Sequence, residues 1–115
     1  MIRAILRRDR EKRFTGYEIS GHAGYAEEGS DIVCAAVSVL ATACANSLES
    51  VCGIHPTVTG GDNGYLKAVL PSAMTEAQRH DAQVILCTLR QGLRDLVESY
   101  PKYVQLSIAN GGRKP

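Results

Sequence analysis

Side chains of similar character recur at every second position over residues 2–6 and again over residues 15–19, as in Ile2, Ala4 and Leu6. A period of two is the spacing of a β-strand, in which alternate side chains point to the same face. The stretch between the two segments is charged and predicts a solvated turn. The start of the chain is therefore expected to form a β-hairpin.

Residues 21–29 follow neither a strand period nor a helical period and contain three glycines. They predict a loop, because glycine adopts backbone angles that other residues avoid. Ser30 or Asp31 is then suited to cap a helix, since either side chain can accept a bond from an N–H group of the first turn. The helix is expected to run to about residues 51–52, with Gly53 as its stop.

The first turns of this helix are apolar around nearly the whole circumference. This predicts deep burial, either under a second helix or at a subunit interface. The apolar run from Ile32 to Ala45 is fourteen residues long, which is shorter than a bilayer span requires.

Residues 57–59 and 65–70 predict two more strands, joined by residues 60–64, which are rich in glycine and in other residues that tolerate positive φ. Thr75 and Gln78 have the spacing of a capping box and open a second predicted helix.

An apolar stripe follows the capping box as far as Tyr100, and Pro101 ends the helix. Residues 104–108 alternate once more and predict a final strand, before a flexible tail over residues 110–115. The predicted order is ββαββαβ. It describes an α+β fold over residues 1–115, a single domain with one sheet of about five strands and two helices packed against it.

The charge balance argues against nucleic acid as a partner. Thirteen Lys and Arg residues oppose twelve Asp and Glu residues, for a net charge of +1, whereas proteins that bind the phosphate backbone are usually strongly basic. The N-terminus lacks the continuous apolar core of a secretory signal, so a cytoplasmic protein is expected. The four cysteines include no close pair and the three histidines are scattered, which favours reduced thiols and no zinc site.

Cys34 lies three or four positions into the first predicted helix, where unpaired N–H groups and the helix dipole favour negative charge. This matters because the thiolate is the nucleophilic form of cysteine. His22 lies in the loop that leads into the same helix, so its imidazole can come beside Cys34 and act as proton acceptor. Such a pair attacks a carbonyl carbon through sulfur and returns a proton to the leaving amine.

Two further residues lie near Cys34. Ser38 is one helical turn later, where it can donate to a substrate oxygen or to the thiolate, and Asp31 is three positions earlier. Asp31 either orients His22 or only caps the helix. A lone cysteine and a lone histidine are a weak signal, because most cysteines on apolar helices are small core residues. The other three cysteines, at positions 44, 52 and 87, are interpreted as such core residues.

The residues around His22 and Cys34 are a more specific signal of function than the spacing of these two residues. Residues 21–26 (GHAGYA), Gly29 and residues 31–38 (DIVCAAVS) resemble the signature of the bacterial ribosomal-processing cysteine proteases called Prp. The resemblance continues through residues 46–49 (NSLE) and 100–104 (YPKYV), so it covers nearly the whole chain.

The resemblance implies an endopeptidase that removes a short N-terminal extension from the precursor of ribosomal large-subunit protein twenty-seven. The catalytic cysteine and histidine of the family correspond to Cys34 and His22, and Asp31 and Ser38 occupy further motif positions. A homodimer without a cofactor is also implied. Gly21, Gly24 and Gly29 fit a mobile loop that closes over an extended peptide.

Two other functions remain open from the residues alone. The chain can be a non-catalytic ribosome-assembly factor in which the helix start binds a peptide and Cys34 is merely packed. It can also be a thiol redox sensor, which predicts a reversible oxidation product of Cys34 and tolerance of His22→Ala.

Overall fold

The computed structural model describes residues 1–111, so most of the predicted tail, residues 112–115, lies outside the described residues. The described part confirms the ββαββαβ order and the α+β fold class. Its elements are β1 (Ile2–Arg8), β2 (Phe14–Ser20), α1 (Ile32–Ser50), β3 (Thr57–Asp62), β4 (Tyr65–Val69), α2 (Glu76–Ser99) and β5 (Val104–Ala109).

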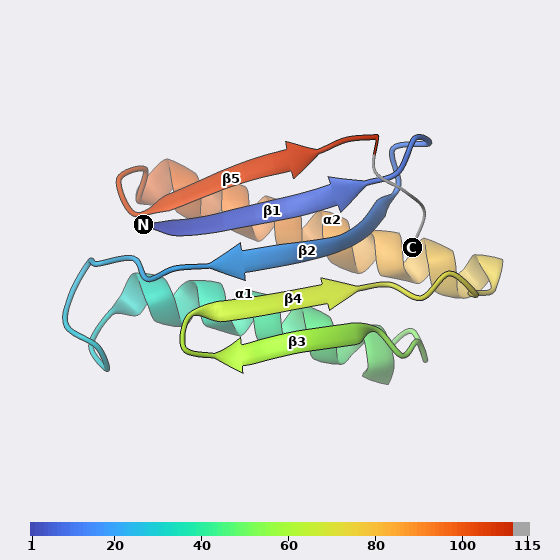
Figure 1. Cartoon of the computed structure of the whole chain (residues 1–115), viewed down its shortest axis with the longest axis horizontal. Helices are drawn as coiled ribbons and strands as arrows, with labels where there is room; N and C mark the ends of the chain where they lie inside the picture. The colour runs from blue at the N-terminus through green and yellow to red at the C-terminus, as the bar shows by residue number, and fades with distance from the viewer. Residues whose placement is uncertain (112–115) are drawn as a thin grey trace.

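The five strands form one sheet in the order β3-β4-β2-β1-β5. The β1–β2 and β3–β4 hairpins are antiparallel, and they join through an antiparallel pairing of β2 with β4. In contrast, β5 pairs parallel to β1 after the chain has passed through α2. Both helices cover the same face of the sheet (Figure 1). The start of β1, the end of β2, the β3–β4 turn and the start of α1 therefore lie at one end of the molecule.

The core lies between this sheet face and the two helices. Residues at helical spacing on one side of α1 and of α2 are buried, namely Val33, Val37, Ala41, Ala45 and Leu48 on α1 and Ala82, Leu86, Leu89 and Leu93 on α2. The hydroxyl of Tyr17 on β2 donates a hydrogen bond of 2.7 Å to the Ala41 carbonyl, which ties α1 to the sheet. Burial raises the pKa of this phenol well above its ordinary value.

The capping predictions for both helices are confirmed. Thr75 and Gln78 form a complete capping box at the start of α2. Asp31, rather than Ser30, is the residue that caps α1, and the side chain of Asp31 accepts the N–H groups of Val33 and Cys34.

Within the single chain, α1 is not deeply buried by the second helix as one alternative predicted, and burial at a subunit interface stays a prediction. Ile32 and Val39 keep 58% and 67% of their surface exposed. The sheet and α2 cover one side of the helix only, and the opposite side, although apolar in sequence, contacts neither. This side includes Ile32, Ala35, Val39 and Ala43, and is called the outer face of α1 below.

The apolar run of fourteen residues is by itself too short to span a bilayer, but it lies within a helix of nineteen residues. By length and composition alone, this helix is long and apolar enough to cross a membrane. A core helix passes the same test, and the buried stripe of α1 packs on the sheet as a core helix does.

Candidate active site

The start of α1 is tied to the glycine-rich loop by Asp31. Its Oδ1 atom accepts hydrogen bonds of 3.0 Å from the N–H groups of Val33 and Cys34, and its Oδ2 atom accepts 3.0 and 3.3 Å bonds from Tyr25 and Ala26. These hydrogen bonds hold the pKa of the Asp31 carboxyl below its ordinary value of 3.8, and the bond from the Cys34 N–H contributes most. The carboxylate is therefore the helix cap, and it also fixes the path of the loop beside the helix.

Residues 21–23 are held by three different parts of the fold. The N–H of Gly21 donates a 2.8 Å bond to the Gly64 carbonyl in the β3–β4 turn. The carbonyl of His22 accepts a 2.6 Å bond from the α-amino group of Met1, next to the first strand. The N–H of Ala23, whose side chain is buried, points at the Cys34 sulfur at 3.2 Å. The histidine thus sits in the fixed part of the loop.

The second half of the loop is more open. Gly21, Gly24 and Gly29 all have positive φ, which agrees with the loop predicted from their sequence. A Cβ atom at Gly21 would clash with the Met1 carbonyl, whereas one at Gly24 or Gly29 would meet nothing within 4 Å. Tyr25 packs edge-on against Tyr100 and Tyr103, with ring centroids 5.6 and 5.1 Å away. Closure of this loop over a peptide stays a prediction.

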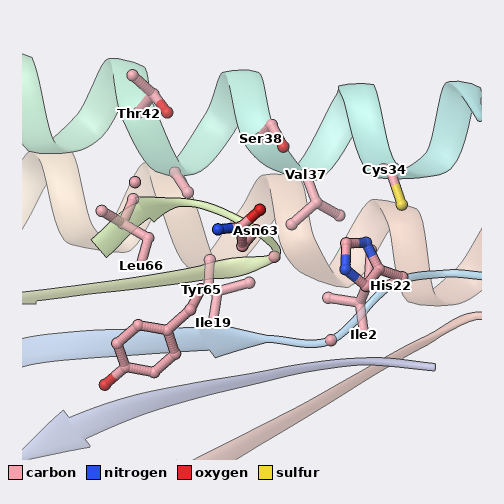
Figure 2. Close-up of a pocket in the computed structure, with 14 residues that line it drawn as sticks. Ile2, Ile19, His22, Cys34, Val37, Ser38, Thr42, Asn63, Tyr65 and Leu66 are labelled. Atoms are coloured by element: carbon pink, nitrogen blue, oxygen red, sulfur yellow. The ribbon is translucent and has the colours of Figure 1, made fainter. Parts of the chain in front are cut away.

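Cys34 and His22 line one pocket of about 250 Å³. Figure 2 shows the sulfur pointing from α1 toward the segment that carries the imidazole. Cys34 is half-buried and His22 is exposed, so the sulfur is partly shielded while the imidazole reaches solvent. An N–H group aimed at sulfur, as that of Ala23 is, stabilises negative charge there, and so does a helix N-terminus.

The pocket extends from Cys34 along α1. Ser38 and Thr42 line it on the next two turns of the helix, as Figure 2 shows. Apolar side chains from β1, β2, α1 and β4 also line it, namely Ile2, Ile19, Val37, Ala41 and Leu66. The predicted position of Ser38 beside the nucleophile is therefore what the structure shows, and Thr42 was missed, although it repeats the same spacing of four.

The β3–β4 turn forms the opposite wall. Asn63 and Gly64 contribute to the lining, and Figure 2 shows the Asn63 side chain pointing from the turn toward α1. The sequence identified this segment only as a turn that tolerates positive φ, which Asn63 and Gly64 do adopt, at 51° and 72°. Nothing in the local pattern indicates that it lies beside His22.

The other cysteines lie apart from this site. Cys44 is half-buried and Cys52 is buried, and burial raises the pKa of both thiols. Cys87 is exposed, so its interpretation as a core residue is wrong, because the buried stripe of α2 passes through positions 86 and 89 and leaves position 87 outside. Among the side chains that the structure describes, no three His, Cys, Asp or Glu residues form a group that could hold a metal ion.

A cysteine at a helix start, a histidine from the adjoining loop and a pocket beside both are the parts of a cysteine protease site. A family model described as cysteine protease Prp matches residues 1–105. The chain therefore belongs to the Prp family of cysteine proteases, and it is a cysteine endopeptidase.

Relatives of known sequence agree with this assignment. The chain is 31% identical over 101 residues to the ribosomal processing cysteine protease Prp of Bacillus subtilis, an alignment that covers 87% of this chain and 90% of the relative. The Prp of Staphylococcus aureus is 27% identical over 110 residues, covering 93% and 98% of the two chains.

Solved structures share the fold. The Staphylococcus aureus Prp in complex with a covalently linked product peptide has a TM-score of 0.83 at 27% identity, and covers 94% of this chain and 99% of its own. A Streptococcus mutans protein has a TM-score of 0.79 at 31% identity, and covers 96% and 95% of the two chains.

Proposed function

We propose that this protein removes the N-terminal extension from the precursor of ribosomal large-subunit protein twenty-seven, with Cys34 as nucleophile and His22 as proton carrier. The observation that carries the proposal is that both side chains line one pocket at the start of α1. The names of the relatives, which are ribosomal processing proteases, support the substrate class.

The chemistry follows from the two side chains. The Cys34 thiolate attacks the scissile carbonyl carbon and forms a C–S bond, and the His22 imidazolium gives its proton to the leaving amine as the C–N bond breaks. The product at this stage is a thioester on Cys34 and a free amine. Neutral His22 then takes a proton from water, whose oxygen attacks the thioester, and the carboxylic acid leaves as Cys34 regains its thiolate.

Asp31 and Ser38 support this reaction in different ways. Asp31 fixes the helix start and the loop through its four bonds to backbone N–H groups. Ser38 lines the pocket one turn beyond the nucleophile, where its hydroxyl can donate to the oxygen that becomes negative in the transition state.

The pocket supports a peptide with an apolar side chain near the cleaved bond. Its apolar lining lies beside Cys34, and Ser38, Thr42 and Asn63 supply polar groups around it. Carbon-rich walls favour an apolar residue, while the polar groups can bond the substrate backbone. No cofactor takes part in this mechanism, because thiolate and imidazole supply both the nucleophile and the proton.

We also propose that the protein is a cytoplasmic homodimer that acts without direct contact to nucleic acid or membrane. The outer face of α1, with Ile32 and Val39 exposed, supports the dimer, because a second copy would cover apolar surface that the single chain leaves open to water. The net charge of +1 supports a protein partner over a nucleic acid.

The test is to incubate the purified protein with the precursor and with the mature form of the ribosomal protein, and to follow both by mass spectrometry. We expect the precursor alone to lose a short N-terminal peptide. The matched control is Cys34→Ala, which should leave both forms intact. An unchanged precursor with the folded wild-type protein would contradict the proposed substrate.

A further inference from the structure

The turn between β3 and β4 touches the histidine of the proposed dyad. Its two central residues are Asn63 and Gly64, and the Gly64 carbonyl accepts the N–H of Gly21, the residue before His22. A Cβ atom built on Gly64 would lie 2.8 Å from His22 Nε2 and 2.9 Å from its Cε1. The imidazole therefore lies against the bare Cα of Gly64, in space that any other side chain would fill.

Resting on the proposed role of His22 in proton transfer, we infer that Gly64 is a positioning residue for that histidine. Its carbonyl holds the backbone before His22 by accepting the Gly21 N–H, and its lack of a side chain leaves the space that the imidazole occupies. Asn63, whose side chain points toward α1, lies on the same turn, so this turn forms one wall of the site and sets the place of the imidazole within it.

Turn chemistry alone does not require glycine at this position. Consecutive residues with φ of 51° and 72° make the two-residue hairpin turn that asparagine followed by glycine favours. Asparagine itself also tolerates positive φ. A Gly64→Asn variant therefore keeps a backbone that the turn accepts, and what it adds is a Cβ atom in the space of the imidazole.

Such a variant is expected to displace the imidazole from its place beside the turn while the sheet and the helices stay folded. The added Cβ atom would also lie 2.8 Å from the Gly21 carbonyl, so relief must come from movement of the His22 segment or of the turn. Misplacement of a reacting group by about 1 Å can cost roughly a hundredfold in rate. We expect Gly64→Asn and Gly64→Ala to lower kcat between about tenfold and a hundredfold, with KM little changed.

The matched control is Gly53→Ala. Gly53 has nearly the same φ, 69°, but lies at the end of α1, and a Cβ atom there would meet only Gln78 Nε2 at an ordinary 3.7 Å. Gly53→Ala should therefore cost stability through backbone strain and leave kcat unchanged. Wild-type kcat for Gly64→Asn would overturn the inference.

A second measurement works even where cleavage is too slow to follow. The NMR signal of the His22 Cε1–H group should move in Gly64→Asn and stay in place in Gly53→Ala, at a pH where the imidazole is in one protonation state. An unmoved signal in a folded Gly64→Asn protein would also overturn the inference.

The variants also separate this inference from the proposed function. Alkylation of Cys34 by iodoacetamide should change in Gly64→Asn when His22 is present and stay the same when His22→Ala is already in place, because Gly64 acts through that ring. An equal change in both backgrounds would overturn the inference. Failure of the wild-type protein to cleave the precursor would contradict the proposed substrate and leave the NMR and alkylation results valid.

Discussion

At the scale of single residues, the proposed mechanism gives Cys34 three neighbours with separate functions. In this mechanism the helix start and the Ala23 N–H favour negative charge on sulfur, and the His22 imidazole carries the proton. Of these, only the imidazole can exchange a proton with a leaving group. Each single substitution at the site should therefore affect a different step.

Cys34→Ser should abolish measurable turnover and leave the fold intact. The serine hydroxyl is far less acidic than a thiol, and one histidine does not compensate for that difference. We expect kcat to fall roughly a thousandfold or more. Cleavage of the precursor measures this loss, and circular dichroism checks that the variant is folded. Turnover near that of the wild type would contradict the assignment of the nucleophile.

Ser38→Ala should keep measurable activity. Loss of one hydrogen bond in the transition state typically lowers kcat on the order of a hundredfold to a thousandfold. Steady-state kinetics would show the loss in kcat rather than in KM. Unchanged kinetics would assign Ser38 to packing along the pocket wall.

At the scale of elements, the start of α1 and the glycine-rich loop behave as one unit, because both oxygens of Asp31 are used on different segments. Asp31 therefore does more than cap the N-terminus of α1. It holds Tyr25 and Ala26 near the nucleophile, while Gly24 and Gly29 leave the loop free of close contacts at two points.

Asp31→Asn should destabilise the protein near neutral pH and reduce its sensitivity to acid. The folded-state pKa of Asp31 lies below the ordinary value. The stability that the carboxylate contributes is therefore complete above about pH 5 and is lost as the pH falls through the folded-state pKa. Asparagine still caps the helix, but its NH₂ group cannot accept the N–H bonds that Oδ2 accepts.

The measurement is urea denaturation of both proteins between pH 7 and pH 3. The difference between their unfolding free energies should shrink as the pH falls. Asp9 and Glu18, whose carboxyl pKa values are also lowered, titrate in both proteins and cancel in the difference. A difference that stays constant over this range would mean that the Asp31 charge contributes nothing to stability.

At the scale of the whole molecule, the sheet and the two helices form a layered domain in which α1 has two apolar sides and uses one of them internally. A stable protein interface buries about 800 Å² on each partner. A surface of that size needs neighbouring apolar residues, and the outer face of α1 provides them at helical spacing.

Val39→Asp should convert the proposed dimer to a monomer, because it places a charge in the middle of the outer face of α1. The control is Val84→Asp on α2, where the side chain is 53% exposed and belongs to the other helix. Sedimentation velocity of the three proteins at the same concentration measures the effect. A dimer that survives Val39→Asp but not Val84→Asp would place the interface on α2 instead.

The local sequence alone determined the elements of this protein and supplied the residues of the proposed chemistry. Period-two alternation, the Thr75 capping box and the glycines around His22 specify structure over a few neighbouring residues, and the structure confirms them. His22 and Cys34 could also be placed near each other from sequence, because eleven residues separate them and the loop that carries His22 leads directly into the helix of Cys34.

Contacts between distant segments were decided only by the tertiary structure. Gly64 contacts His22 because β4 pairs with β2, and no local sequence pattern predicts the order of strands in the sheet. The same holds for burial: the apolar composition of α1 and the position of Cys87 suggested a buried environment, but which side of a helix is covered depends on where the sheet and the other helix pack. The periodicity of the sequence shows which residues share a side of a helix or strand, and long-range packing decides which side is buried.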